Sequence, residues 1–149
     1  MFKQINYKTN LIKPNAVLLD TDNTLYEYEP AHKRAINATA KKLNNLLCLN
    51  KKEFLNFYKS ARSQIKIELG DVASSHSRLL YFQRLLEICG LKAELLTALD
   101  LEQTYWRTFL ANAPLFEGVE LFLESLRKKN IPIAIVTDLT AHIQLRKLT

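Results

Sequence analysis

The chain has 149 residues, of which 48% are hydrophobic and 24% charged, and it contains only 3 Gly and 4 Pro, which excludes a disordered, collagen-like or low-complexity protein. Its 2 Cys are too few for a disulfide scaffold, and its formal net charge is +6. The sequence has no apolar run long enough for a secretory signal or a membrane span, so we expect a cytoplasmic protein without a membrane partner.

Two short apolar segments near the ends of the chain are predicted to be strands. The first, over 16–19, is continuously apolar and meets a polar cluster at 20–24. The second, over 131–136, stops at the polar pair Thr137 and Asp138. Continuous apolar runs of this length are typical of buried parallel strands. Both strands are therefore predicted to end in polar side chains.

The long segment between these strands is predicted to be helical. Asn50 and Glu53 form a capping-box pattern at the start of one helix, and Gly70 is expected to end it. Four helices are expected in this segment, over about 30–47, 51–69, 75–88 and 93–110. A fifth, over about 119–129, leads into the second strand, and another begins near Ala141. This order of elements predicts a helical subdomain inserted between the two strands.

The helical segment carries the surplus of positive charge. Between Pro30 and Ala113 there are 13 Lys or Arg against 7 Asp or Glu. Because these residues are spread out, they are typical of the solvated faces of amphipathic helices. A basic nucleic-acid-binding protein is the last of three hypotheses, since acidic strand ends would repel phosphate without a cation. We expect no nucleic-acid partner.

The strongest candidate for chemistry is the polar cluster after the first strand, which contains Asp20, Asp22 and Thr24. Open α/β sheets bind ligands at the carboxyl ends of their strands, and alternation along the chain would place Asp20 and Asp22 on one side. One carboxylate could then act while ionised, and the other could hold and return a proton. A hard cation such as Mg²⁺ would relieve their repulsion. The alternative interpretation is an ordinary polar turn after a strand.

The segment AVLLDTDNTL resembles the first motif of the haloacid dehalogenase superfamily, and IPIAIVTDLT resembles the second. The helices between them are similar to the helical cap of one large subclass, and PLFEGVELFLESLRKKN is similar to the return from cap to core. The resemblance implies an α/β fold with a Rossmann-like parallel core, incomplete in this chain, and an inserted helical cap. It divides the chain into core (1–29), cap (30–113) and core again (114–149).

The resemblance implies a role for each matching residue. Asp20 would be the nucleophile that forms an aspartyl-phosphate, and Asp22 the general acid and base. Both would hold Mg²⁺, Asp22 through its backbone carbonyl. Thr137 would bind a phosphoryl oxygen, and Asp138 would have a structural or substrate-orienting role. Because an acid at position 22 separates the phosphatases from the dehalogenases, we expect a Mg²⁺-dependent phosphatase of a small phosphorylated metabolite.

This sequence also departs from the family pattern. The family has a third-motif Lys and a fourth-motif acidic pair on later strands, and Lys147 comes too soon after the second motif to be that Lys. We therefore expect a truncated chain that is weakly active or inactive alone. The alternative function is a non-catalytic fragment or interaction module. Unpaired strand edges would favour self-association.

Several other residues are weaker candidates. Tyr26 and Tyr28 are expected either near the mouth of the site or in packing. Arg78 and Arg84 lie on one predicted helix with Tyr81 and Phe82 and could bind an acidic group of the substrate, although such a helix is more often simply amphipathic. No metal-ligand spacing involves the three His residues, which are expected to be ordinary surface residues: His32, His76 and His142.

Overall fold

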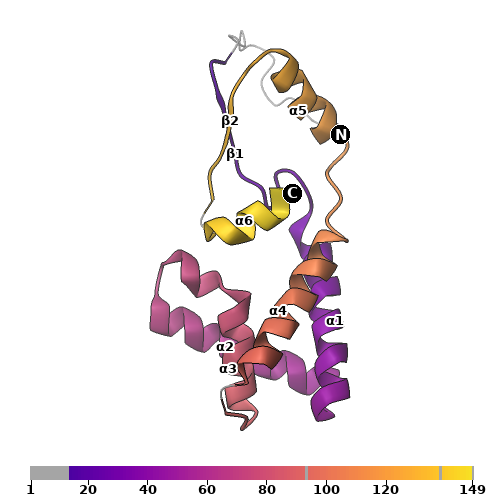
Figure 1. Ribbon diagram of the computed structural model, residues 1–149, viewed down its shortest axis with the longest axis vertical. Coiled ribbons are helices and arrows are strands. Elements are labelled where there is room, and N and C mark those ends of the chain that lie inside the picture. The colour runs from indigo at the N-terminus through magenta and orange to yellow at the C-terminus, as the bar shows by residue number, and fades with distance from the viewer. Residues whose placement is uncertain (1–13, 93, 138, 149) are drawn as a thin grey trace. The chain divides into compact units, whose positions relative to one another are not determined.

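The structure is a computed structural model that describes residues 14–92, 94–137 and 139–148 (Figure 1). The described residues form two compact units. The first, called here the sheet unit, contains residues 14–27 and 114–137. The second, the helical unit, contains residues 28–113 without 93, together with 139–148. A small parallel sheet in a mostly helical chain confirms the predicted α/β class.

The sheet unit is built on two parallel strands, β1 (Val17–Leu19) and β2 (Ile133–Ile135). Leu19 lies opposite Ile135, and the backbone N–H of Val136 donates to the carbonyl of Leu19 at 2.9 Å. The carboxyl ends of the two strands therefore lie side by side. Helix α5 (Val119–Lys128) precedes β2 and buries Val119 and Leu126.

The strands are more exposed than their apolar sequences predict. Leu18 in β1 is 70% exposed, and Val136 directly after β2 is 57% exposed. A strand is buried only when other elements cover both faces of its sheet. In the described part of the sheet unit that cover is incomplete, so the expectation of buried strands was wrong, whereas their parallel pairing is confirmed.

The helical unit contains five α-helices and one short 3-10 helix in its described residues. These elements are α1 (Tyr28–Leu47), α2 (Lys51–Leu69), η1 (Ala73–His76), α3 (Arg78–Ile88), α4 (Leu95–Leu110) and α6 (Ala141–Leu148). Within the unit α1 packs against α4, α2 against α3, and α3 against α4 (Figure 1). Its core is rich in aromatic side chains with almost no exposure: Phe54, Tyr81, Phe82, Tyr105 and Phe109.

Two helix starts show how local sequence sets the boundaries. The capping box of α2 is present: the Asn50 side chain accepts from the N–H of Glu53, and the Glu53 carboxylate accepts from the N–H of Asn50. Gly70, at φ 66°, caps the other end. Helix α3 starts later than the expected position near 75, because the Ser77 hydroxyl caps it by accepting from the N–H of Leu80 at 3.4 Å.

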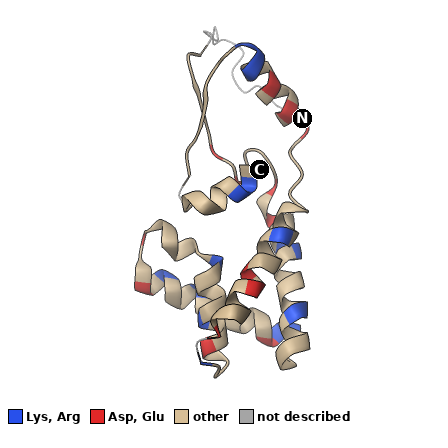
Figure 2. Cartoon of the chain, viewed as in Figure 1, with Lys and Arg blue, Asp and Glu red and all other residues tan. Residues whose placement is uncertain are grey.

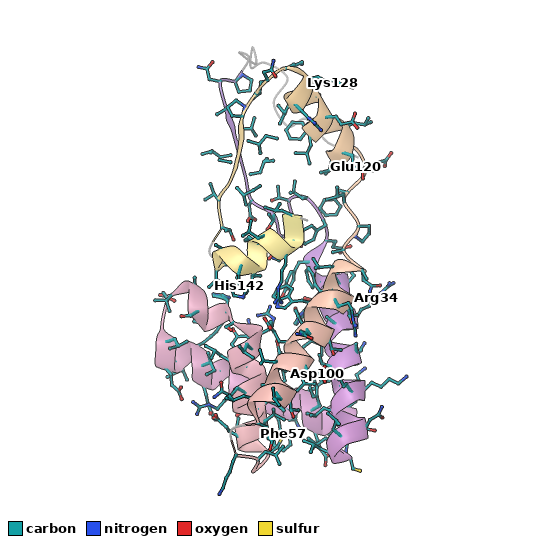
Figure 3. All side chains as sticks on the ribbon, viewed as in Figure 1. Arg34, Phe57, Asp100, Glu120, Lys128 and His142 are labelled. Carbon is teal, nitrogen blue, oxygen red and sulfur yellow. The ribbon has the colours of Figure 1, made fainter. Side chains whose placement is uncertain are left out.

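Polar pairs fix α1 and α4 in antiparallel orientation. Lys42, late in α1, bonds Asp100, early in α4, at 2.5 Å. Arg34, early in α1, donates to Asn112, just after α4. Figure 3 labels Arg34 and Asp100 on these two helices. The start of α1 and the end of α4 therefore lie together, so the chain enters and leaves this helix pair at the same end.

Among the described residues, no helix combines the length and the apolar character needed to cross a bilayer. Lys and Arg side chains of the helical unit are distributed over several helices rather than gathered on one (Figure 2).

Candidate functional site

The loop that follows β1 carries the first two candidate residues. Asp20 is exposed, Thr21 is 1% exposed, and Asp22 is half-buried. This alternation is consistent with Asp20 and Asp22 lying on one side of the chain, as their spacing predicts. The Asp20 side chain makes no hydrogen bond or ion pair with a residue in the described part of the chain. Its carboxylate is therefore accessible.

A tight turn gives this loop its shape. The carbonyl of Thr21 accepts from the N–H of Leu25 at 2.9 Å, and the N–H of Asn23 donates to the carbonyl of Tyr26 at 2.9 Å. Asn23 has φ 60°, a left-handed conformation that Asn adopts more readily than most residues. The N–H of Phe116 donates to the carbonyl of Leu25 at 2.8 Å, which ties the loop to the segment before α5.

Tyr26 holds the second carboxylate. Its ring is 5% exposed, and its hydroxyl donates a hydrogen bond to Oδ1 of Asp22. Burial, together with the hydrogen bond that the hydroxyl donates to Asp22, raises the pKa of Tyr26 well above its usual value, so the phenol keeps its proton. Tyr26 was expected either near the mouth of the site or in packing. The structure shows that it is buried and that it contacts the candidate site residue Asp22. Tyr28 belongs to the helical unit, where it bonds Arg78.

The candidate from the second motif follows the neighbouring strand. Thr137 is half-buried and comes two residues after the end of β2. Because β1 and β2 are parallel and adjacent, Asp20 and Thr137 follow the same edge of the sheet. Asp138 lies outside the described residues.

The donor set offers a partial fit to Mg²⁺. Mg²⁺ is usually held by one or two carboxylates, with water and substrate phosphate completing its shell. Asp20 supplies one exposed carboxylate, and Asp22, whose carboxylate accepts a hydrogen bond from Tyr26, would contribute its backbone carbonyl. Among the residues that the structure describes, no group of three or more His, Cys, Asp or Glu side chains could hold a metal ion.

The expectation that all three His are ordinary surface residues is wrong for His32. His32 on α1 is half-buried, stacks on Tyr28 with centroids 5.3 Å apart, and shares a hydrogen bond of 2.7 Å between its Nδ1 and the Tyr105 hydroxyl. Burial first, and then the charge of Arg78, lower the pKa of His32 to about 4. Tyr28 is one helical turn away, but Tyr105 and Arg78 come from distant parts of the sequence, so no local pattern could have indicated this environment.

Comparisons with known proteins agree with the family resemblance. A model of the haloacid dehalogenase-like hydrolase family matches residues 14–148. A curated protein named ribulose-1,5-bisphosphate 5-phosphatase, from Halopiger xanaduensis, is 37% identical over 134 residues, which cover 89% of this chain and 56% of that protein.

A solved structure is similar in fold. The putative HAD-hydrolase YfnB from Bacillus subtilis, bound to magnesium, matches with a TM-score of 0.56 and 23% identity, covering 89% of this chain and 57% of that one. The chain thus spans little more than half the length of the two relatives described here.

Proposed function

Because the chain belongs to the haloacid dehalogenase-like hydrolase family, we propose that it carries the first half of a phosphatase site for a small phosphorylated metabolite. The observation that carries the proposal is the accessible carboxylate of Asp20 at the end of β1, two residues from an Asp22 that Tyr26 orients. The phosphatase name of the 37% identical relative supports the same reaction class.

The proposed reaction has two steps. In the first, a carboxylate oxygen of Asp20 attacks phosphorus, the bond from phosphorus to the ester oxygen breaks, and protonated Asp22 gives its proton to the departing alcohol. In the second, Asp22 takes a proton from water, which attacks phosphorus and releases inorganic phosphate and the Asp20 carboxylate. The Thr137 hydroxyl would donate to a phosphoryl oxygen. Bound Mg²⁺ would offset the charge of the phosphate and the two carboxylates.

The test is hydrolysis of p-nitrophenyl phosphate with and without Mg²⁺. Asp20→Asn removes the nucleophilic carboxylate with almost no change in volume, so we expect at least a hundredfold loss of turnover. Asp71→Asn is the matched control, since Asp71 is an exposed acid in the helical unit and its variant should keep the wild-type rate.

The outcomes separate the two functions proposed for this chain. Turnover that needs Mg²⁺ and is lost only in Asp20→Asn supports the phosphatase. Equal turnover in both variants would contradict it. Folded protein without any turnover would show that these residues do not form a working site in this chain alone, and it would favour the non-catalytic module.

A further inference from the structure

Three buried polar atoms of the helical unit have no hydrogen-bond partner. They are Oη of Tyr58, Nε of Arg78 and Nε1 of Trp106, and the described residues contain no other such side-chain atom. Buried polar groups in folded proteins are nearly always paired, so each exception needs an explanation. All three atoms carry a hydrogen to donate. Nε of Arg78 and Nε1 of Trp106 can only donate, so these two lack an acceptor, whereas the Tyr58 hydroxyl could either donate or accept.

The three residues gather around one guanidinium. Cζ of Arg78 lies 5.2 Å from the ring centroid of Tyr105, 5.4 Å from that of Tyr81 and 6.0 Å from that of Trp106. The ring of Tyr58 is 6.0 Å from the ring of Tyr81. We call the set the Arg78 cluster: Tyr28, Tyr58, Arg78, Tyr81, Tyr105 and Trp106. Its residues come from α1, α2, α3 and α4, which pack against one another in the helical unit (Figure 1).

The guanidinium has only neutral protein acceptors. Nη1 donates to the carbonyl of His76 at 2.9 Å, and Nη2 donates to the hydroxyl of Tyr28 at 2.6 Å. Within the described part of the chain, no carboxylate lies within 4.0 Å of Arg78. Aromatic faces compensate a buried cation only in part, and arginine remains protonated at any physiological pH. Among the residues that the structure describes, the Arg78 cluster is thus a positive site without a counter-charge.

The charged residues near Arg78 differ from those near Arg84, the other arginine of α3. Arg84, on the same helix, pairs with Glu68 at 2.9 Å and with Glu87 at 3.2 Å. Nζ of Lys147 is 5.8 Å from the ring centroid of Trp106, which adds positive charge. In the described part of the chain, Arg84 therefore has two carboxylate partners, whereas Arg78 has none.

We propose that the Arg78 cluster binds the phosphate group of a small molecule. A phosphate presents only acceptors at neutral pH, in several directions, and it supplies the negative charge that the cluster lacks. A water molecule could accept from one orphaned donor but would leave the charge uncompensated. Arg78 and Tyr28 are only half-buried, so the cluster reaches the surface of the unit. This site lies within the helical unit and does not depend on the chemistry of Asp20.

Trp106 provides the signal for the test, since it is the one Trp in the sequence. Inorganic phosphate is titrated into the full chain at constant ionic strength, with EDTA present, while Trp106 fluorescence is recorded. We expect a saturable change. Arg78→Gln should weaken binding about tenfold or more, whereas Arg84→Gln is the matched control and should bind phosphate like the wild type.

Two further variants serve as controls. One shows that an altered response does not come from misfolding, and the other shows that phosphate does not bind at the proposed catalytic site instead. Tyr58→Phe removes one orphaned donor without changing the packing, so it should raise the melting temperature of the phosphate-free protein and reduce the additional rise that phosphate causes. Asp20→Asn should bind phosphate as the wild type does, which separates this site from the proposed catalytic one.

Three results would overturn the proposal. They are a linear, non-saturating fluorescence response of the wild type, equal binding by Arg78→Gln and the wild type, and malonate binding as tight as phosphate binding. The last would exclude phosphate as the preferred group. None of these results bears on turnover at Asp20, so the two proposals can fail separately.

Discussion

At the scale of single residues, the most informative contact is the hydrogen bond from Tyr26 to Asp22. Tyr26→Phe keeps the buried ring and removes only this bond. If Asp22 is the general acid, we expect kcat to fall roughly tenfold, since the carboxyl group loses its orientation. Stability should fall by about 1 kcal/mol. Steady-state hydrolysis and urea unfolding measure the two effects.

The control for this variant is another buried hydroxyl. Thr39→Val removes a hydroxyl on α1 that donates to the carbonyl of Ile36 at 2.9 Å. It should leave kcat unchanged. A rate for Tyr26→Phe equal to that of Thr39→Val would show that Tyr26 has a structural role only.

His32 links stability to pH. Its folded-state pKa is about 4, whereas an unfolded His has a pKa near 6.5. Between these values the unfolded chain binds the proton and the folded chain does not, so the free energy of unfolding falls as the pH drops from about 6.5 to 4. The charges near His32 include Arg78 and Arg62, which oppose protonation, and Glu29, which favours it.

Urea unfolding at pH 7 and at pH 4.5 tests this linkage. Because His32 is partly exposed, solvent screening reduces the effect, and we expect a loss on the order of 1 kcal/mol in the wild type beyond that in His32→Gln. The comparison with His32→Gln removes contributions from carboxylates that titrate in the same range. Identical pH dependence of the two proteins would show that His32 is not the group responsible.

At the scale of elements, the start of α2 illustrates a boundary that is set locally. Asn50→Ala removes the acceptor of two backbone N–H groups, those of Lys52 and Glu53. We expect thermal or urea unfolding to show a loss of about 1 kcal/mol. Asn56→Ala, at an exposed position inside the same helix, should leave stability unchanged or slightly raised. An equal loss in both variants would argue against the cap.

At the scale of the whole molecule, the elements that could be predicted are those whose signals are local. The capping box of α2 and the polar residues after each apolar run are read directly from neighbouring positions, and both have counterparts in the structure. The exposure of β1 and β2 could not be predicted, because burial depends on which elements cover a sheet.

Some features of the candidate site could likewise be predicted from local sequence, and others could not. The spacing of Asp20 and Asp22 predicts that they share one side, whereas the turn that brings the Tyr26 hydroxyl to Asp22 depends on backbone conformation, including the left-handed Asn23. The Arg78 cluster joins residues from four helices and has no local signature. The roles assigned to Asp20, Asp22 and Thr137 stay predictions.

The antiparallel pairing of α1 and α4 has a consequence for the order of folding. β1 and β2 pair across more than a hundred intervening residues, so closing this loop in an unfolded chain is entropically costly and slow. Once the helical unit has folded, its entrance and exit lie at the same end of the α1–α4 pair, and the flexible loop shrinks to roughly a quarter of its length. This shortening lowers the closure cost by about 1 kcal/mol. We therefore expect the helices to fold first and to bring together the two strand ends that carry Asp20 and Thr137.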